Sequence, residues 1–122
     1  MSRLDRRAAE RGGRIAETKC AVWLMLHGWR IVARRSKHPV GEVDLVARRG
    51  RVLAFIEVKA RGSVSAAAES ILPRQQERIA RAAAAFLQTR PHLAALDPRF
   101  DVMLGASRRL LVHIPNAWHI LR

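Results

Sequence analysis

The stretch GEVDLVARRGRVLAFIEVKARG, residues 41–62, contains two apolar runs separated by a short polar segment around Gly50. Runs of this length and composition predict the two strands of a β-hairpin, near residues 42–48 and 51–59. Charged side chains nevertheless lie in or beside the apolar runs: Glu42, Asp44, Glu57 and Lys59. Carboxylates are rarely placed in apolar strands unless they are paired with a cation or bind one.

The pairing of the two strands decides which side chains share a face of the sheet. If Arg49-Gly50 forms a two-residue turn, Arg48 pairs with Arg51 and Asp44 faces Phe55. Asp44 and Glu57 then become diagonal neighbours on one face, about 7–8 Å apart, with Lys59 beside them. A three-residue turn would move Asp44 to the other face. Alternation gives that other face only apolar residues: Val43, Leu45, Ala47, Val52, Ala54, Ile56 and Val58.

Two carboxylates beside apolar residues repel each other unless a cation lies between them. Lys59 is one such cation, and a divalent metal is a better one, because Mg²⁺ binds one or two carboxylates together with waters and substrate phosphates. The sequence therefore predicts a metal site at Asp44 and Glu57. Two other interpretations stay open. The acids of a half-exposed hairpin pair with nearby arginines, or Lys59 forms a salt bridge to Glu57 or Glu42.

The segments on either side of the hairpin supply the remaining elements. Residues 1–13 are charged and end in two glycines, which indicates a basic flexible arm before a single domain at 14–122. The other expected elements are a helix at about 14–27 ending at Gly28, a strand at 29–35, a helix at about 73–89, and strands at 99–104 and 110–114. The predicted order is α-β-β-β-α-β-β, an α/β domain with one mixed sheet flanked by helices.

The charge of the chain points to a polyanionic partner. Its 122 residues fit one domain, and 23 Lys and Arg against 10 Asp and Glu give a net charge of +13. Arginine forms bidentate contacts with phosphates, and a charge of this size repels itself without a partner. Because the arginines are spread along the chain, a nucleic acid is favoured over a membrane surface. A basic surface that only keeps the protein in solution is the alternative.

Other features restrict the location and the chemistry. Cys20 is the only cysteine, so no disulfide forms within the chain and a reducing, cytoplasmic location is expected. The first residues lack the apolar segment of a secretory signal, and the apolar run AVWLML (21–26) is too short to cross a bilayer. The five histidines lack the spacing of a zinc site.

Three motifs carry a resemblance to a known family: GEVDLVAR (41–48), FIEVKAR (55–61) and LPRQQERI (72–79). They resemble the YraN-like family of bacterial proteins, which is similar to the PD-(D/E)xK nuclease superfamily and to archaeal Holliday-junction resolvases. The resemblance extends from the first helix to IPNAW (114–118). It implies a restriction-endonuclease-like core with Asp44, Glu57 and Lys59 as the superfamily triad. The proline that the superfamily places before the aspartate is replaced by Val43.

The same resemblance suggests further site residues. Glu17 matches an acidic position that resolvase-like members use at the metal site; the alternative is a solvated glutamate on an amphipathic helix. Gln76 matches a glutamine near the start of the second helix, where it either reaches the site or caps a loop. The backbone carbonyl of Val58 would be a further metal ligand. The cofactor implied is Mg²⁺ or Mn²⁺, and the function implied is metal-dependent hydrolysis of DNA phosphodiester bonds, as an endonuclease on branched or structured DNA.

Two other functions remain open. The first is a catalytically weak or inactive nucleic-acid-binding module with the same fold, and the second is a basic partner in a ribonucleoprotein. RNA stays open as a ligand beside DNA, and a homodimer stays open because resolvase-like relatives often cut as dimers. The arginines near the motifs are the expected phosphate-binding residues: Arg34, Arg35, Arg48, Arg49, Arg61 and Arg74.

Overall fold

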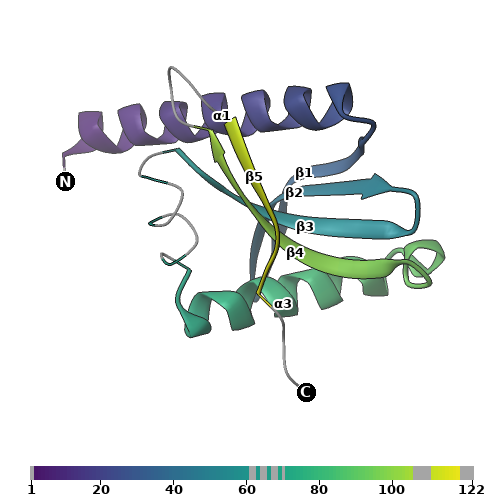
Figure 1. Ribbon diagram of the computed structural model, residues 1–122. Helices are drawn as coiled ribbons and strands as arrows, with labels where there is room; N and C mark the ends of the chain where they lie inside the picture. Colours follow the sequence, from purple (N-terminus) through teal and green to yellow (C-terminus); the bar gives the residue numbers. More distant parts are fainter. Residues whose placement is uncertain are drawn as a thin grey trace.

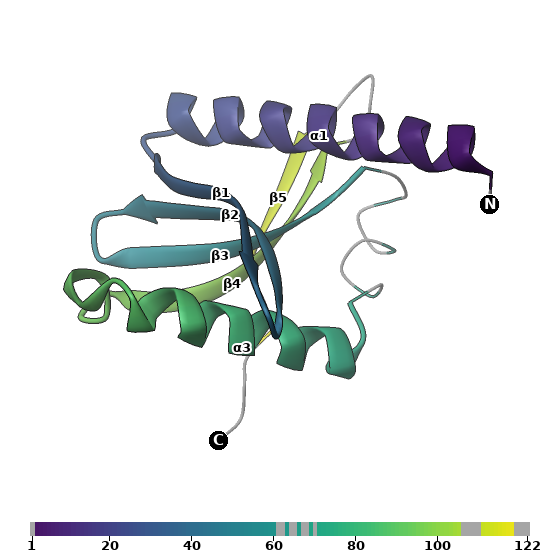
Figure 2. The ribbon, with the colours of Figure 1, turned by 180° about the vertical axis from the view of Figure 1, so that it is seen from behind.

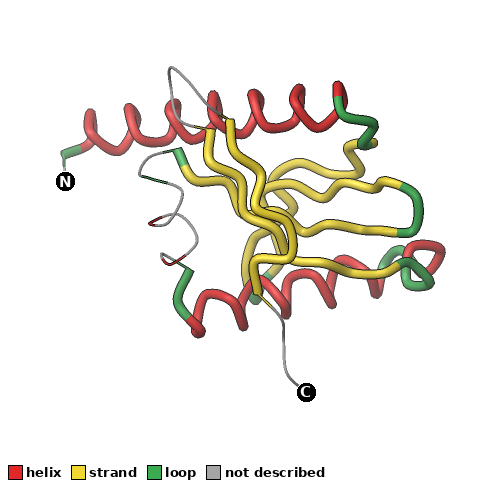
Figure 3. Tube along the Cα trace, viewed as in Figure 1, coloured by secondary structure: helices red, strands yellow, loops and turns green. Residues whose placement is uncertain are grey.

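Two helices cover the two faces of one β-sheet, so the chain has three layers (Figure 1). The computed structural model describes residues 2–60, 63, 66, 69, 71–105 and 111–118, without the side chains of residues 5–12. Figure 3 shows the strands as the middle layer, with α1 along one side and α3 along the other. Apolar side chains on both faces of a sheet require cover of this kind.

The five strands form one mixed sheet in the order β1-β2-β3-β4-β5. Neighbouring strands are antiparallel except β3 and β4, which are parallel. A parallel pair needs a crossover connection, and α3 lies in the connection between β3 and β4. The bounds of the elements are α1 Arg3–Leu26, β1 Arg30–His38, β2 Gly41–Arg49, β3 Val52–Lys59, α3 Pro73–Gln88, the 3₁₀ helix η1 Pro91–Leu93, β4 Asp97–Gly105 and β5 Leu111–Trp118.

The predicted order of elements and the mixed sheet are confirmed, whereas the predicted start of the first helix was wrong. Helix α1 begins at Arg3 instead of near Arg14, so residues 3–13 are helical. This segment contains four Arg and two Ala, whose high helix propensity outweighs the two glycines. At its other end the helix ends at Leu26, and Gly28, the predicted stop, follows it with φ of 85°. The division into an arm and a domain at residue 13 stays a prediction.

The hairpin turn lies one residue later than predicted. Arg49 pairs with Val52 and Leu45 with Ile56, so the turn is Gly50-Arg51 and the predicted register was wrong by two residues. Gly50 has φ of 61°, a left-handed conformation that glycine adopts without strain at the first position of such a turn. A slip of two residues preserves the alternation of side chains between the two faces, so it does not by itself exchange the faces. It also moves Asp44 from a position diagonal to Glu57 to the position opposite it.

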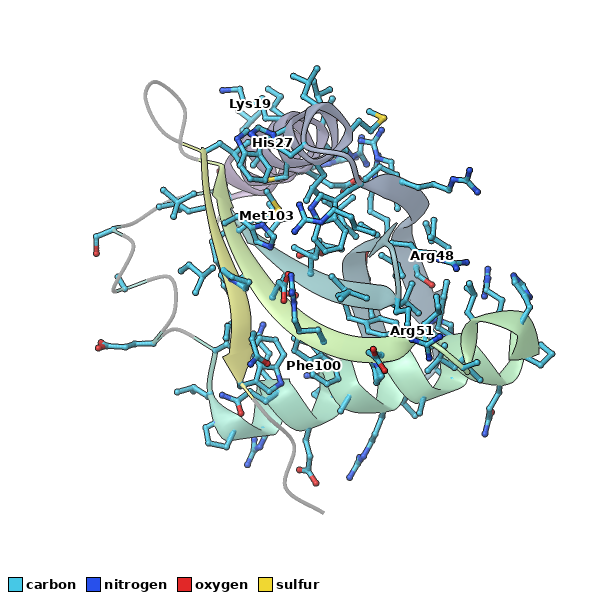
Figure 4. The ribbon with its side chains drawn as sticks, turned by 45° about the vertical axis from the view of Figure 1, so that its right-hand side comes forward. Lys19, His27, Arg48, Arg51, Phe100 and Met103 are labelled. Atoms are coloured by element: carbon cyan, nitrogen blue, oxygen red, sulfur yellow. The ribbon has the colours of Figure 1, made fainter. Side chains whose placement is uncertain are left out.

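Both faces of the hairpin are buried, each under a different helix. Between the sheet and α1 lie Leu45, Ala47, Ala54 and Ile56, with Val52 and Val58 partly buried beside them. Six of the seven residues predicted to share a face therefore do so; the exception is Val43, which packs on the α3 side. Figure 4 shows the same division in β4, where Met103 points toward α1 and Phe100 toward α3.

A buried acid joins β4 to β5. Asp101 is fully buried and accepts two hydrogen bonds from Arg99 (both 2.9 Å) and one from the backbone N–H of Asn116 (2.9 Å). His113 Nε2 lies 2.7 Å from the same carboxylate. Burial alone would raise the pKa of Asp101, but the hydrogen bonds from His113, Arg99 and Asn116 outweigh it and hold this pKa below its ordinary value. The carboxylate is therefore charged in the folded protein.

We expect Asp101→Asn to lower the free energy of unfolding by about 3–5 kcal/mol, because it leaves the partly buried Arg99 guanidinium without its anion. Since the folded pKa is lowered, the carboxylate stabilises the fold above its unfolded pKa of about 4, and this stability is lost as the pH falls further. Urea denaturation at several pH values measures both effects. The exposed control Asp97→Asn should change stability by no more than about 0.5 kcal/mol. Equal losses in both variants would contradict the role of Asp101.

Two glycines allow the helices to approach the sheet closely. A Cβ atom on Gly41 would lie 3.0 Å from the backbone carbonyl oxygen of Arg78 in α3, and one on Gly105 would lie 3.0 Å from the backbone of Ala16 in α1. Figure 2 shows the β1–β2 turn reaching α3. Both contacts lie beside segments that carry predicted site residues, Glu42 and Asp44 after Gly41 and Glu17 after Ala16.

Gly41→Ala should lower the free energy of unfolding by about 1–3 kcal/mol, because the new methyl group has to push α3 away from the hairpin. The matched control is Gly13→Ala, where an added Cβ meets nothing within 4 Å and lies inside a helix. That substitution should stabilise the protein by up to about 1 kcal/mol. Thermal and urea denaturation give both values. An unchanged free energy of unfolding in Gly41→Ala would show that Gly41 and the backbone of α3 are not in tight contact.

Candidate metal centre

The candidate site lies where the pairing of β2 with β3 ends. Backbone pairing runs from Arg49–Val52 to Leu45–Ile56, and the next residues along the two strands are Asp44 and Glu57. Instead of a further rung, the carboxylate of Asp44 accepts a hydrogen bond of 2.8 Å from the backbone N–H of Val58. This bond fixes Asp44 against β3, so both carboxylates lie at the open end of the hairpin.

Asp44 and Glu57 are half-buried acids that share a hydrogen bond. Burial raises the pKa of Glu57 to about 8; the negative charge of Asp44 acts in the same direction, and Lys59 acts against it. Burial also raises the pKa of Asp44, although the N–H of Val58 lowers it. A hydrogen bond between two carboxyl groups needs a proton, so near neutral pH the pair holds a proton that another cation can replace.

Lys59 and Gln75 are the polar side chains beside Glu57. Lys59 Nζ lies 3.9 Å from Glu57 Oε1, a long ion pair, and the Gln75 amide lies 3.4 Å from the same oxygen. Gln76, for which the sequence left open either a place at the site or the capping of a loop, donates to the backbone carbonyl of Ile71 (2.9 Å) in the loop before α3. Consecutive residues point about 100° apart around a helix, so the sequence could not show which of the two glutamines faces the acids.

Glu17 reaches the same end of the sheet from α1, but its charge is already paired. It is a buried acid, 4% exposed. Oε1 of Glu17 accepts a hydrogen bond from Arg34 Nε (2.9 Å), and Oε2 lies 3.1 Å from Arg35 Nε. The proximity of Glu17 to Asp44 was predicted, and its charge is among the causes that raise the pKa of Asp44. The two arginines that hold Glu17 were expected to bind phosphates instead.

Asp44 lies between two cavities. One, of about 360 Å³, is on the α3 side and is lined by Asp44 and Glu57 together with Gln75, Arg74 and Arg78. The other, of about 390 Å³, is on the α1 side and is lined by Asp44, Glu17, Arg35, Lys37 and the Val58 segment. Glu42 is exposed and lines both cavities. Asp44 therefore borders a cavity on each face of the sheet, Glu57 borders the one on the α3 side, and basic residues line both cavities.

The residues present fit a divalent cation of the magnesium type. In the described part of the chain no three His, Cys, Asp or Glu side chains form a metal-binding group, so a closed protein cage is not available there. Mg²⁺ typically uses one or two carboxylates and completes its coordination with water and substrate oxygens. Asp44 and Glu57 supply two facing carboxylates whose pKa values are raised, first by burial and then by neighbouring negative charge, so a cation placed between them would be favoured.

The arginines expected at the site divide into three groups. Arg34 and Arg35 pair with Glu17, and Arg74 lines the cavity on the α3 side. Arg48 and Arg49 lie at the turn end of the hairpin, the far end of β2 from Asp44; Figure 4 shows Arg48 there. The sixth, Arg61, lies outside the described residues. Arg78 lines the cavity with Arg74 and was not predicted at the site, although its spacing of four residues from Arg74 placed both on one helix face.

This mixed sheet, with α1 and α3 on its two faces and the acidic hairpin at one end, is a restriction-endonuclease-like fold. The chain belongs to the family described as uncharacterised protein family UPF0102, whose model matches residues 16–104. This is the YraN-like, PD-(D/E)xK nuclease-like group that the hairpin motifs resemble. The matched region contains each predicted site residue.

Relatives share the sequence over nearly their whole length. The UPF0102 protein of Parvibaculum lavamentivorans is 58% identical over 111 residues, which cover 91% of this chain and 84% of the relative. That of Paramagnetospirillum magneticum is 52% identical over 117 residues, covering 93% and 91%. That of Sphingopyxis alaskensis is 52% identical over 115 residues, which cover 94% of this chain and 98% of the relative.

No helix in the described ranges has the length and apolar character needed to cross a bilayer.

The facing arrangement of the acids predicts opposite pKa shifts at Glu57 in two variants. Asp44→Asn removes the neighbouring negative charge and should lower the pKa of Glu57 from about 8, whereas Lys59→Met removes a cation and should raise it further. Carboxyl ¹³C shifts followed over a pH titration measure the value directly. The control Arg48→Met, at the far end of β2, should leave it unchanged. If Asp44→Asn has no effect, the two carboxyl groups do not face each other in solution.

Proposed function

We propose that this protein is a metal-dependent endonuclease-like enzyme that hydrolyses phosphodiester bonds in DNA, with branched or structured DNA as its substrate. The observation that carries the proposal is the pair of half-buried, facing carboxylates of Asp44 and Glu57 at the end of the hairpin. Basic residues border the cavities on both sides of this pair, and the chain as a whole has a charge of +13.

In this mechanism each residue has a separate task. Asp44 and Glu57 hold one or two Mg²⁺ or Mn²⁺ ions, with the backbone carbonyl of Val58 as a further ligand. When bound, the metal supplies the Lewis acidity that polarises the phosphoryl group and activates water as a nucleophile. Asp44 is kept in place by the N–H of Val58. Lys59 neutralises the negative charge that develops on the phosphorus centre as the bond to the leaving oxygen breaks.

Other side chains orient the acids and the substrate. Gln75 donates toward Glu57 and keeps that carboxylate turned toward Asp44, a positioning role in place of the one predicted for Gln76. Arg74 and Arg78 line the same cavity and bind phosphates that flank the scissile one. A reducing cytoplasmic location fits the single buried Cys20. A homodimer would place two such sites on one branched substrate.

Cleavage of a labelled DNA panel tests the proposal. Single-stranded, duplex, flap and four-way forms are incubated with Mg²⁺, Mn²⁺ or EDTA and either wild type, Asp44→Asn, Glu57→Gln or Lys59→Met. We expect metal-dependent cutting by the wild type and background levels for the two acid variants. Lys59→Met should cut about a hundredfold more slowly, the scale of losing one group that stabilises developing charge.

The binding of the same DNA separates the proposal from its alternatives. Asp44→Asn should bind DNA as well as the wild type or more tightly, because it removes a negative charge from a surface that contacts phosphates. Cutting in EDTA, or cutting by Asp44→Asn, would contradict a metal-dependent mechanism at this site. Binding without cutting in every condition would favour the nucleic-acid-binding module. A loss of folding in the acid variants, with no DNA binding by the wild type, would favour the structural ribonucleoprotein partner.

A further inference from the structure

Glu17 and two consecutive arginines of β1 form an ion cluster next to the acidic pair. The Glu17 side chain is 5% exposed, and each of its carboxylate oxygens lies close to one arginine, Arg34 Nε at 2.9 Å and Arg35 Nε at 3.1 Å. Arg34 also donates to the hydroxyl of Thr18 (2.8 Å). The cluster therefore ties α1 to β1 and fixes the direction of both guanidinium groups.

This pairing leaves Glu17 poorly suited to bind a metal. A carboxylate with a guanidinium nitrogen near each oxygen has its charge neutralised, and a divalent cation placed on it would repel both arginines. Asp44 and Glu57 are different: among the described residues the one ion pair to either acid is that of Lys59 with Glu57, at 3.9 Å. The contacts of Glu17 suit a residue that orients Arg34 and Arg35.

Arg35 in particular is held in an unusual way. Its φ is 47°, the left-handed region that a residue with a side chain adopts at a cost in backbone energy. Its side chain is 42% exposed, and among the described residues no hydrogen bond uses either of its terminal nitrogens. A strained backbone that presents an accessible pair of guanidinium donors indicates a recognition role rather than a packing role.

The donors of Arg35 border the cavity on the α1 side of the acids. This cavity, of about 390 Å³, is also lined by Asp44, Val58 and two further basic residues, Arg14 and Lys37. A phosphate in it would lie next to a metal held by Asp44 and within reach of Arg35. Two parallel N–H donors of one guanidinium match two oxygens of one phosphate.

We propose that Arg35, positioned by Glu17, binds a backbone phosphate of the DNA on the α1 side of Asp44, and that Glu17 is a positioning residue instead of a metal ligand. This assignment rests on the proposed function, because the phosphate it concerns adjoins the bond that Asp44 and Glu57 act on. It places DNA across the end of the hairpin, with Arg35 on one side of the acids and Arg74 and Arg78 on the other.

Metal binding without DNA provides the first test. Titration calorimetry with Mn²⁺ alone compares wild type, Glu17→Gln and Asp44→Asn. We expect Glu17→Gln to keep the wild-type affinity and Asp44→Asn to lose it. An equal loss in Glu17→Gln would make Glu17 a ligand and overturn its positioning role. If wild type binds no Mn²⁺, the metal mechanism of the proposed function fails, whereas the phosphate site of Arg35 is still tested by the second measurement.

DNA binding in EDTA provides the second test, using a short labelled duplex and fluorescence anisotropy over a range of salt concentrations. Arg35→Lys keeps the charge but loses the paired donors, and should raise Kd about tenfold. Arg35→Gly should also lower the slope of log K against log salt by about one phosphate contact. Arg48→Lys and Arg48→Ala, at the far end of β2, are the controls and should change Kd much less. Equal effects at positions 35 and 48 would overturn the proposal.

Glu17→Gln separates positioning from simple electrostatics in the same assay. This variant gains one unit of positive charge, which by itself should strengthen DNA binding. If Glu17 orients Arg35, the affinity should fall instead; a rise would overturn the positioning role. Thermal denaturation controls for folding. Glycine adopts φ of 47° freely, but Arg35→Gly also leaves the buried Glu17 carboxylate with Arg34 as its remaining arginine, so the binding of all variants is compared at a temperature at which each is shown to be folded.

Discussion

The site depends on a single contact, the hydrogen bond from the backbone N–H of Val58 to the carboxylate of Asp44. It lies where the pairing of β2 with β3 stops, and it uses a side chain where a sheet would normally use a carbonyl. The bond turns the carboxyl group of Asp44 toward β3 and therefore toward Glu57. Burial and the mutual repulsion of these two acids then raise the pKa of Glu57 to about 8. The backbone thus holds two carboxylates close together, and a metal cation between them would reduce their repulsion.

The two helices complete the site because both come unusually close to the sheet. Gly41 lets the β1–β2 turn rest on the backbone of α3, which brings Gln75 and Arg74 to the acids. Gly105 lets α1 pack closely on β4 at Ala16, the residue that precedes Glu17. A side chain at either glycine would separate a helix from the layer that carries Asp44 and Glu57. The same contacts that bury the two faces of the sheet therefore bring basic residues to both sides of the acidic pair.

Much of this could be predicted from the sequence, because side chains alternate between the two faces along most of the hairpin, with Val43 as the exception. The predicted register was wrong by two residues, yet Asp44 and Glu57 kept their predicted face, since side chains repeat with a period of two. Choices that depend on tertiary contacts were not readable. Gln75 and Gln76 are chemically identical, and only the rotation of α3 turns the first toward Glu57. The strained φ of Arg35 and its contact with Glu17 likewise arise from the packing of β1 against α1.

The acids that are not exposed in the described part of the chain fall into two kinds. Glu17 is held by two arginines, and Asp101 by Arg99, His113 and a backbone N–H. Asp44 and Glu57 have only Lys59 at 3.9 Å and share a proton instead. Cations are not scarce in a protein with 23 basic residues. An acidic pair left undercompensated amid so many arginines therefore supports the proposed divalent metal, whose remaining coordination positions would accept water and a substrate phosphate.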